Sequence, residues 1–263
     1  MPSKLAVQMY TLRDHTRTAE DLDRALAKVA AIGYQAVQFS AIGCMSGAAP
    51  ELSPQDARRM LDRHGLRCVA THRDWNDLLQ RTDQEIAFHR TLGCDYAAIG
   101  SIPRPFHDKG PDGYREMIRA AAGFISKLKA AGIRWGYHNH SFEFARAERG
   151  GKRLFAVLID ESPPDFLFEL DTYWAAHAGC SPAPLLIRLA GRIPVVHFKD
   201  MEVALGEGPV MAPIGEGNLD WDAIIAACEA GGTEWYCIEQ DICRRDPFDC
   251  LESSLKFLSA KGL

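Results

Sequence analysis

The sequence predicts a single (β/α)₈ barrel that spans residues 1–263 as one domain. The first observation behind this prediction is length, because 263 residues is close to the size of such a barrel, about 250 residues. The second is a repeated unit in which an amphipathic segment ends at a glycine and a short apolar run follows. The third is that these runs are apolar on both faces, as parallel strands covered by helices must be. Eight such alternations favour a closed barrel over an open doubly wound sheet.

The first unit sets the pattern. Leu5-Ala6-Val7 is apolar and forms the first strand. Leu22, Leu26 and Val29 then recur at helical spacing and give a helix one apolar face. Gly33 follows, and a glycine after a helix takes the left-handed conformation that ends it.

The next units repeat this pattern with clearer helix starts. Ala36–Phe39 and Arg67–Ala70 are the second and third strands. Between them, Ser53-Pro54 offers an N-cap followed by a proline at the first helical position. Thr82 with Glu85 forms a capping box for the third helix.

The second half is marked by a long helical stripe from Tyr114 to Leu128 and by the apolar runs Ile193–Val196 and Trp235–Ile238. The fifth helix has the weakest pattern, because Gly150-Gly151 and Pro163-Pro164 crowd it. Strands are therefore predicted at 5–9, 35–39, 67–71, 95–99, 133–138, 166–170, 194–198 and 235–239. Helices are predicted at 18–31, 53–64, 83–92, 113–131, 151–160, 182–190, 220–230 and 247–260.

The composition is that of an ordinary globular protein, with 47% hydrophobic and 25% charged residues. The net charge of −5 and the absence of a basic stripe argue against a nucleic-acid partner. No apolar run approaches the roughly 18 residues of a membrane span, and no signal-peptide core opens the chain. The eight cysteines form no CxxC pair and several lie in apolar runs. We therefore expect a reduced, cytoplasmic protein.

Polar residues gather where the predicted strands end, which is where barrels of this class carry their reactive groups. Four of the last exits present ligand-type side chains, and two imidazoles with two carboxylates suit one divalent metal with positions left open for substrate oxygens. These candidates are His138 or His140, Asp171, His197 and Glu239. The other exits carry Gln8 and Tyr10, Gln38, His72 and Lys199.

Each candidate ligand also has a purely structural interpretation. His197 follows an apolar strand and fits a satisfied histidine at the rim of the core. Asp171 fits an N-cap of the short segment after it. Glu239 ends a buried strand, where a carboxylate is costly unless it is paired or bound to a cation. One metal site explains four such exits better than four separate accidents do.

Several neighbours are candidates for substrate contact or proton transfer. Period 2 places His138 and His140 on one face, so one is expected to bind metal and the other to touch substrate. Glu143 either leans into the same mouth or is a solvated loop charge. Lys199 either assists a leaving group or pairs with Asp200. Further substrate contacts are expected from Tyr10, Gln38, His72 and Trp174, and an apolar wall from Trp75, Phe106 and Trp221.

Six stretches resemble the sugar phosphate isomerase/epimerase family, within the xylose-isomerase-like barrel superfamily, in the right order over nearly the whole chain. They are Val7–Arg13, His138–Phe144, Glu169–Thr172, His197–Asp200, Gly215–Trp221 and Ile238–Asp241. The resemblance implies a barrel that binds one Mn, Co, Mg or Zn ion, acts on a small carbohydrate and often forms homo-dimers or homo-tetramers.

The resemblance also implies a ligand set of Glu, Asp, His and Glu. Asp171, His197 and Glu239 match it directly, whereas His138 stands where ketose 3-epimerases of the family carry glutamate. Trp174 stands where epimerases and the related endonuclease carry histidine. These departures look more like the dehydratase, lyase and keto-glycoside branches. They also disfavour an endonuclease, which needs more metal-binding histidines than this chain offers.

The chemistry expected at this mouth begins with loss of a proton next to a carbonyl and formation of an enolate, which a divalent cation stabilises. Glu239, His138, His140 and Lys199 are the candidate catalytic groups. Reprotonation of the enolate gives isomerisation or epimerisation, and loss of a β-substituent gives elimination. A non-catalytic sugar-binding barrel is the alternative from another class, which the four intact ligand-type residues disfavour.

Overall fold

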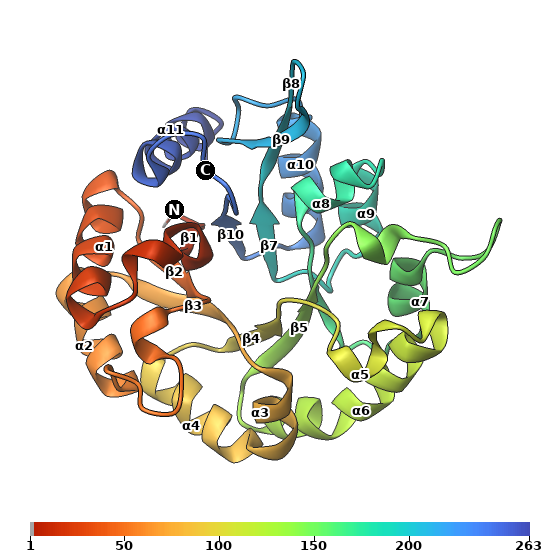
Figure 1. Cartoon of the computed structure of the whole chain (residues 1–263), viewed down its shortest axis with the longest axis horizontal. Helices are drawn as coiled ribbons and strands as arrows, with labels where there is room; N and C mark the ends of the chain where they lie inside the picture. Colours follow the sequence, from red (N-terminus) through yellow and green to blue (C-terminus); the bar gives the residue numbers. More distant parts are fainter. Residues whose placement is uncertain (1–2) are drawn as a thin grey trace.

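The computed structural model describes residues 3–263 and confirms the (β/α)₈ barrel. Eight parallel strands stand at the centre and the helices form a ring outside them (Figure 1). The strand order β6-β5-β4-β3-β2-β1-β10-β7 follows the chain around the barrel. The strands are β1 (Leu5–Gln8), β2 (Ala36–Phe39), β3 (Arg67–His72), β4 (Tyr96–Ile99), β5 (Arg134–His138), β6 (Leu167–Glu169), β7 (Val195–Phe198) and β10 (Trp235–Ile238).

All eight helices expected between the strands are present, with ends within a few residues of the prediction. They are α1 (Ala19–Ile32), α2 (Pro54–Arg63), α4 (Thr82–Leu92), α6 (Gly110–Ala130), α7 (Leu154–Glu161), α9 (Pro182–Arg188), α10 (Trp221–Gly231) and α11 (Pro247–Ala260). Thr18 and Asp21 form a capping box at the start of α1, and Gly33 ends that helix with a φ of 119°.

The predicted start of the fifth helix at residue 151 is three residues too early, since α7 begins at Leu154. The preceding segment turns back on itself instead: Arg146 and Arg153 form an isolated antiparallel bridge, and Gly150 between them has a φ of 79°. A left-handed residue inside this turn interrupts the helical path.

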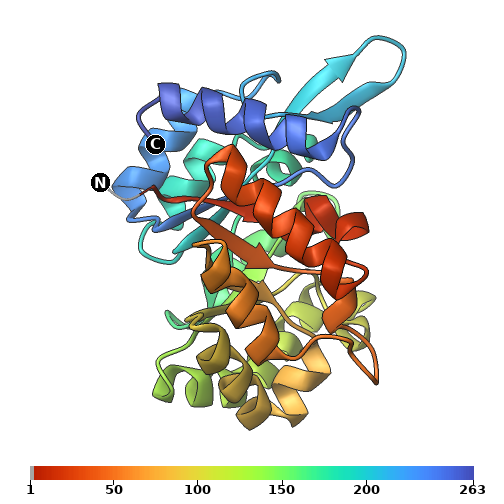
Figure 2. The ribbon, with the colours of Figure 1, turned by 90° about the vertical axis from the view of Figure 1, so that its left-hand side faces the viewer.

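The loops after the strands carry further short elements that the sequence pattern did not predict. They are η1 (Met9–His15), η2 (Gly43–Met45), α3 (Trp75–Gln80), α5 (Arg104–His107), η3 (Phe142–Phe144), α8 (Thr172–His177) and the antiparallel pair β8 (Asp200–Ala204) and β9 (Gly208–Ala212). The β8–β9 hairpin extends away from the barrel (Figure 2). None of the helices in residues 3–263 has the length and apolar composition that crossing a membrane requires.

The core has two layers. The larger lies between the strands and the outer helices, and the smaller fills the barrel interior with small side chains such as Ala6, Ala36 and Ala98. The buried Tyr96 also lies in this interior. A Cβ at Gly136 would lie 1.8 Å from the Tyr96 hydroxyl oxygen, so only glycine leaves room for this ring.

The seam between β6 and β7 is the least regular part of the barrel. These two strands share no regular ladder, and an isolated parallel bridge joins Asp171 to His197 instead. The His197 amide donates to the Leu170 carbonyl over 2.9 Å. The barrel is therefore closed by two residues that the sequence predicts to be metal ligands.

Candidate active site at the mouth of the barrel

A cavity of about 350 Å³ opens at the C-terminal ends of the strands. This volume lies in the range of small-molecule sites, about 300–1,000 Å³. A second cavity of about 340 Å³ adjoins it and shares Ser40, Ala41 and His72. The first cavity is lined by Tyr10, Ser40, Ala41, His72, Gly100, His138, His140, Lys199, Glu239 and Asp241.

Lys199 is the buried cation of this cavity. Its Nζ lies 3.0 Å from Asp171 Oδ2, 3.0 Å from Glu239 Oε2 and 3.1 Å from Asp241 Oδ1. Burial alone would lower the pKa of the lysine, but these three carboxylates raise it well above its usual value. Lys199 therefore stays an ammonium and supplies positive charge.

Lys199 and Asp200, both within the described residues, do not form the ion pair that was the alternative interpretation of Lys199. Asp200 instead accepts hydrogen bonds from the amides of Gly215 and Gly217 and from the Trp221 indole nitrogen, the last over 2.7 Å. A Cβ at Gly217 would lie 2.3 Å from Asp200 Oδ1, which explains the glycine there. The Gly-Glu-Gly motif thus anchors the hairpin loop to the barrel.

His197 is fully buried between two carboxylates. Its Nδ1 lies 2.8 Å from Glu239 Oε2 and its Nε2 lies 3.1 Å from Glu169 Oε2. Burial alone would lower the pKa of His197, but Glu169 and Glu239 raise it to about 10. Lys199 and His197 in turn hold the pKa of Glu239 below its ordinary value, against the effect of burial.

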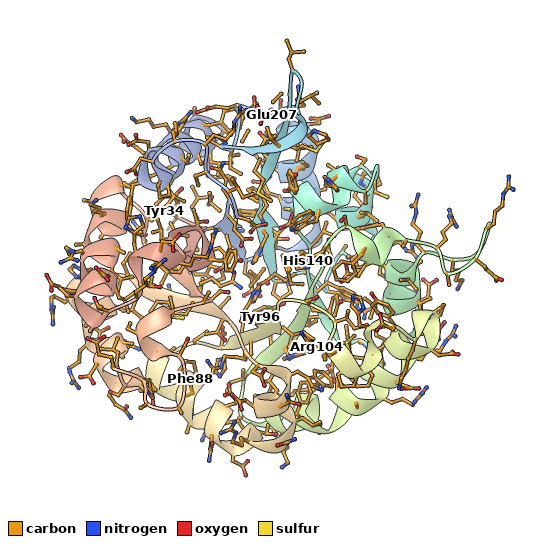
Figure 3. All side chains as sticks on the ribbon, viewed as in Figure 1. Tyr34, Phe88, Tyr96, Arg104, His140 and Glu207 are labelled. Carbon is orange, nitrogen blue, oxygen red and sulfur yellow. The ribbon has the colours of Figure 1, made fainter. Side chains whose placement is uncertain are left out.

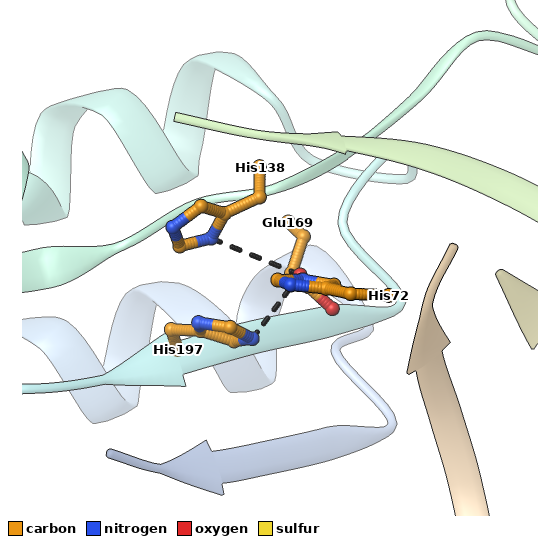
Figure 4. A group of neighbouring side chains, drawn as sticks. All are labelled: His72, His138, Glu169 and His197. Atoms are coloured by element: carbon orange, nitrogen blue, oxygen red, sulfur yellow. Dashed lines mark hydrogen bonds and ion pairs between the residues drawn. The ribbon is translucent and has the colours of Figure 1, made fainter. Parts of the chain in front are cut away.

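Glu169 was not predicted as a site residue, although three imidazoles face it (Figure 4). His72 Nε2 lies 2.5 Å from Glu169 Oε2, and His138 Nδ1 lies 3.7 Å from the same oxygen. Burial opposes ionisation, but His197 and His72 lower the pKa of Glu169 to about 2. The same period-2 rule that pairs His138 with His140 places Glu169 on the face of Asp171, and this signal was available in the sequence.

Asp171 serves two neighbours with its two oxygens. Oδ1 accepts the Trp174 amide over 2.8 Å and caps α8, which confirms the structural interpretation of this residue. Oδ2 faces Lys199 and lies 4.0 Å from His138 Nε2. Burial raises the pKa of Asp171 to about 6, and Lys199 opposes this increase. Capping and cation binding are therefore compatible here.

His138 and His140 lie in one cavity, as the period predicts. The His138 ring is almost fully buried, 4.5 Å from the His197 ring centre, whereas His140 is half-buried toward the centre of the barrel mouth (Figure 3). Burial lowers the pKa of His138 well below its usual value and that of His140 to about 4. Both imidazoles are neutral near neutral pH.

The remaining predicted contacts divide into two groups. Tyr10 and His72 line the cavity. Gln38 is fully buried and bonds Glu169 and His197, while the Trp174 ring lies tilted against His140 with ring centres 5.3 Å apart.

Glu143 is also fully buried, accepting the Tyr137 hydroxyl and the His140 amide, and burial raises its pKa to about 7. It is therefore no solvated loop charge. Trp75, Phe106 and Trp221 do not line this cavity, so no apolar wall forms there from them. Trp75 and Trp221 are buried, Trp75 against Phe106 and Trp221 against Phe198.

The four predicted metal ligands share one property. Each has a buried side-chain atom that makes no hydrogen bond of regular geometry: His138 Nδ1, Asp171 Oδ2, His197 Nδ1 and Glu239 Oε2. The last three of these atoms nevertheless lie 2.8–3.0 Å from a charged neighbour. Donor atoms of Asp171, His197 and Glu239 lie within 4.8 Å of one another, and so do those of His72, His138, Glu169 and His197. A nitrogen and oxygen donor set of this kind suits a divalent transition metal.

The model of one protein family, the xylose isomerase-like TIM barrel, matches residues 26–261. A sugar phosphate isomerase/epimerase from Parabacteroides distasonis is similar in structure, with a TM-score of 0.80, 23% identity, and coverage of 99% of this chain and 95% of that one. An L-ribulose 3-epimerase has a TM-score of 0.71, 16% identity, and coverage of 98% and 94%.

The IOLI protein, whose structure holds a zinc atom, has a TM-score of 0.72, 14% identity, and coverage of 98% and 97%. At these identities the likeness establishes the fold alone. No curated protein sequence matches this chain.

Proposed function

The chain belongs to the xylose isomerase-like TIM barrel family, and from this premise we propose that it is a divalent-metal-dependent enzyme that acts on a sugar or keto-sugar. The reaction begins with loss of a proton from a carbon next to a carbonyl. The observation that carries the proposal is the meeting of His138, His140, Lys199 and Glu239 in one cavity, directly above a buried carboxylate and imidazole cluster.

We propose that one Mn, Co, Mg or Zn ion is held by His138, Asp171, His197 and Glu239. The support is that donor atoms of Asp171, His197 and Glu239 lie within 4.8 Å of one another, and that His138 Nε2 lies 4.0 Å from Asp171 Oδ2. Such an ion would polarise the substrate carbonyl and stabilise negative charge on its oxygen. The Lys199 ammonium lies between two of the same carboxylates, so ion and ammonium compete for Asp171 and Glu239.

His140 is the group we propose for proton transfer with substrate. It is half-buried, lines the cavity and remains neutral near neutral pH, so it has a free nitrogen lone pair. The buried Glu143 accepts the His140 amide and fixes the backbone that carries this ring. Glu239, directly after β10, is a second proton-transfer group as well as a ligand.

Lys199 contributes charge in this mechanism. Three carboxylates keep its proton in place, which makes it a poor proton donor but a strong partner for an oxygen that gains negative charge. Tyr10 and His72 lie on the cavity wall and are proposed to bind substrate hydroxyl groups.

The two proton-transfer groups differ in kind, and this asymmetry supports elimination of a β-oxygen over simple epimerisation. An epimerase gains from an acid/base group of similar strength on each face of the planar enolate. Here one group is an imidazole and the other is a carboxylate whose pKa is lowered. Isomerisation or epimerisation is the second candidate, because the similar solved structures include an L-ribulose 3-epimerase.

The reaction type is tested with metal-loaded protein in deuterated water. Free ketoses and 3-keto glycosides are incubated separately, and products are followed by NMR and mass spectrometry. We expect release of the aglycone or of water from the β-position, with deuterium entering next to the carbonyl. Epimeric, deuterated ketoses without any released group would instead establish epimerisation. No turnover of either class, with or without metal, would contradict both.

A further inference from the structure

The position of one proton in the buried cluster follows from its neighbours. His197 Nε2 faces two oxygens, Gln38 Oε1 at 2.9 Å and Glu169 Oε2 at 3.1 Å. The orientation of the Gln38 amide is fixed, because its nitrogen donates to Glu169 Oε1 over 2.9 Å. Two acceptors facing one ring nitrogen require that this nitrogen carries a hydrogen.

The other ring nitrogen of His197, Nδ1, therefore faces the mouth of the barrel. Nδ1 points at Glu239 Oε2, on the side where Asp171 and Lys199 also lie. Metal-binding histidines nearly always donate their second ring N–H to a carboxylate or carbonyl, which fixes the tautomer and the direction of the lone pair. Glu169 and Gln38 provide such a pair of acceptors beneath His197.

The contacts of Glu169 have the distances of hydrogen bonds. His72 Nε2 and His197 Nε2 lie 2.5 Å and 3.1 Å from Glu169 Oε2. His197 Nδ1, on the other side of the ring, lies 2.8 Å from Glu239 Oε2. The two nitrogens of His197 therefore face different carboxylates, and Glu169 contacts the nitrogen that faces away from Glu239.

We infer that Glu169, with Gln38, is a positioning residue that holds the Nε2 hydrogen of His197 and aims Nδ1 at the cation site formed with Asp171 and Glu239. Both residues are fully buried, so neither contacts substrate. The same carboxylate accepts His72 and faces His138 Nδ1 at 3.7 Å, which leaves His138 Nε2 on the side of Asp171. One carboxylate thus orients the ring nitrogens of three histidines.

The first test reads the hydrogen directly and needs no metal. Long-range ¹H–¹⁵N NMR of histidine-labelled protein, assigned with a His197→Gln variant, reports which nitrogens are protonated. Both ring nitrogens of His197 face a carboxylate in the metal-free protein, so the exchange rate is the deciding readout. We expect the Nε2 hydrogen to be present and to exchange with solvent more slowly than any hydrogen on Nδ1, and to exchange faster in Glu169→Gln. An unprotonated Nε2, or unchanged exchange in the variant, would overturn the inference regardless of whether the protein binds metal.

The second test rests on the proposed metal site and uses calorimetric titration with Zn²⁺ alone. Glu169→Gln should weaken binding by about 10–100-fold. The cobalt absorption spectrum should keep its band positions, because the ligands are unchanged. Glu85→Gln, which neutralises another buried glutamate paired with Arg73, is the matched control and should bind Zn²⁺ as the original protein does. Gln38→Met should act in the same direction and serves if Glu169→Gln does not fold.

The outcomes separate the two proposals. Equal Zn²⁺ affinity in the original protein and Glu169→Gln would overturn the positioning role. A changed cobalt spectrum would make Glu169 a direct ligand and overturn it as well. Absence of Zn²⁺ binding in the original protein, with His197 Nε2 protonated and protected, would contradict the proposed metal site and leave the orienting role supported.

Discussion

At the scale of the residue, the site contains more buried carboxylates than positively charged side chains. Glu169, Asp171, Glu239 and Asp241 surround one ammonium and one imidazole that is readily protonated. Burying unpaired carboxylates is costly, so these positive groups stabilise the fold as well as the site. A divalent ion would contribute to the same balance, which makes Lys199 its natural competitor.

Replacing Lys199 by methionine should raise the affinity for a divalent ion. The substitution keeps the length of the side chain but removes the charge that shares Asp171 and Glu239 with the ion. We expect roughly tenfold tighter binding of Mn²⁺ or Zn²⁺ by calorimetry, equivalent to about 1.4 kcal/mol. Lys129→Met, which removes an exposed lysine paired with Asp165, is the control and should change nothing. Weaker binding in Lys199→Met would mean that the ammonium and the ion do not compete.

Glu239→Gln should keep the fold and much of the metal affinity but slow turnover. The amide can still face His197 and Lys199, whereas it cannot take up or deliver a proton at the reacting carbon. We expect kcat to fall by about 10²–10⁴, measured with the substrate identified in the deuterated-water experiment. Unchanged turnover would remove Glu239 from the chemistry.

At the scale of the element, the strand–helix junctions determine where the reactive groups stand. The apolar runs and the glycines after the helices predicted all eight barrel strands and their helices. The β8–β9 hairpin and α8 could not be predicted in the same way, because both are too short to show a clear period. The hairpin base is held by Asp200, which bonds amides of residues 215 and 217, far along the chain.

Asp171→Asn separates the two tasks of the residue that begins α8. Asparagine caps helices about as well as aspartate, so the Trp174 amide keeps an acceptor and the melting temperature should change little without metal. The charge facing Lys199 is lost, and we expect Zn²⁺ affinity to fall by at least about tenfold. Asp171→Ala should lose both the cap and the ion. Equal Zn²⁺ affinity in Asp171→Asn and the original protein would show that Asp171 is a cap alone.

At the scale of the whole molecule, the fold can be predicted from the spacing of apolar residues along the sequence. The site depends instead on contacts between residues that lie far apart in the sequence. His197 and Glu239 were found because they lie at the ends of predicted strands, and Asp171 because it follows one. Glu169 was not predicted, because only the residue after the sixth predicted strand, Asp171, was considered as a strand exit and Glu169 lies two residues earlier. Gln38 was predicted as a substrate contact, and the structure shows in addition that its amide bonds Glu169 and His197. The contacts among these side chains join strands β2, β6 and β7, and no local sequence pattern shows that these strands bring them together.

The protein without metal should lose stability as pH rises through the alkaline range. Its folded state raises the pKa of His197 from 6.5 to about 10, so folding binds an extra proton between these values. This contribution is complete below pH 6.5 and disappears as pH approaches about 10. Melting temperatures measured from pH 7.5 to 9.5 should fall more steeply for the original protein than for His197→Gln. Parallel curves would show that His197 is not protonated by folding.

The irregular seam between β6 and β7 gives the ligand-type residues a second task. Asp171 and His197 form the isolated bridge there, and the His197 amide is bonded to Leu170. A bound ion would therefore hold the seam closed. At an ion concentration of 100 times the dissociation constant, it would add about 2.7 kcal/mol to the free energy of opening the seam. Opening of the β6–β7 seam would then require release of the ion. The backbone amide of His197, which bonds the Leu170 carbonyl and does not contact the ion, would therefore exchange with solvent more slowly when the ion is bound.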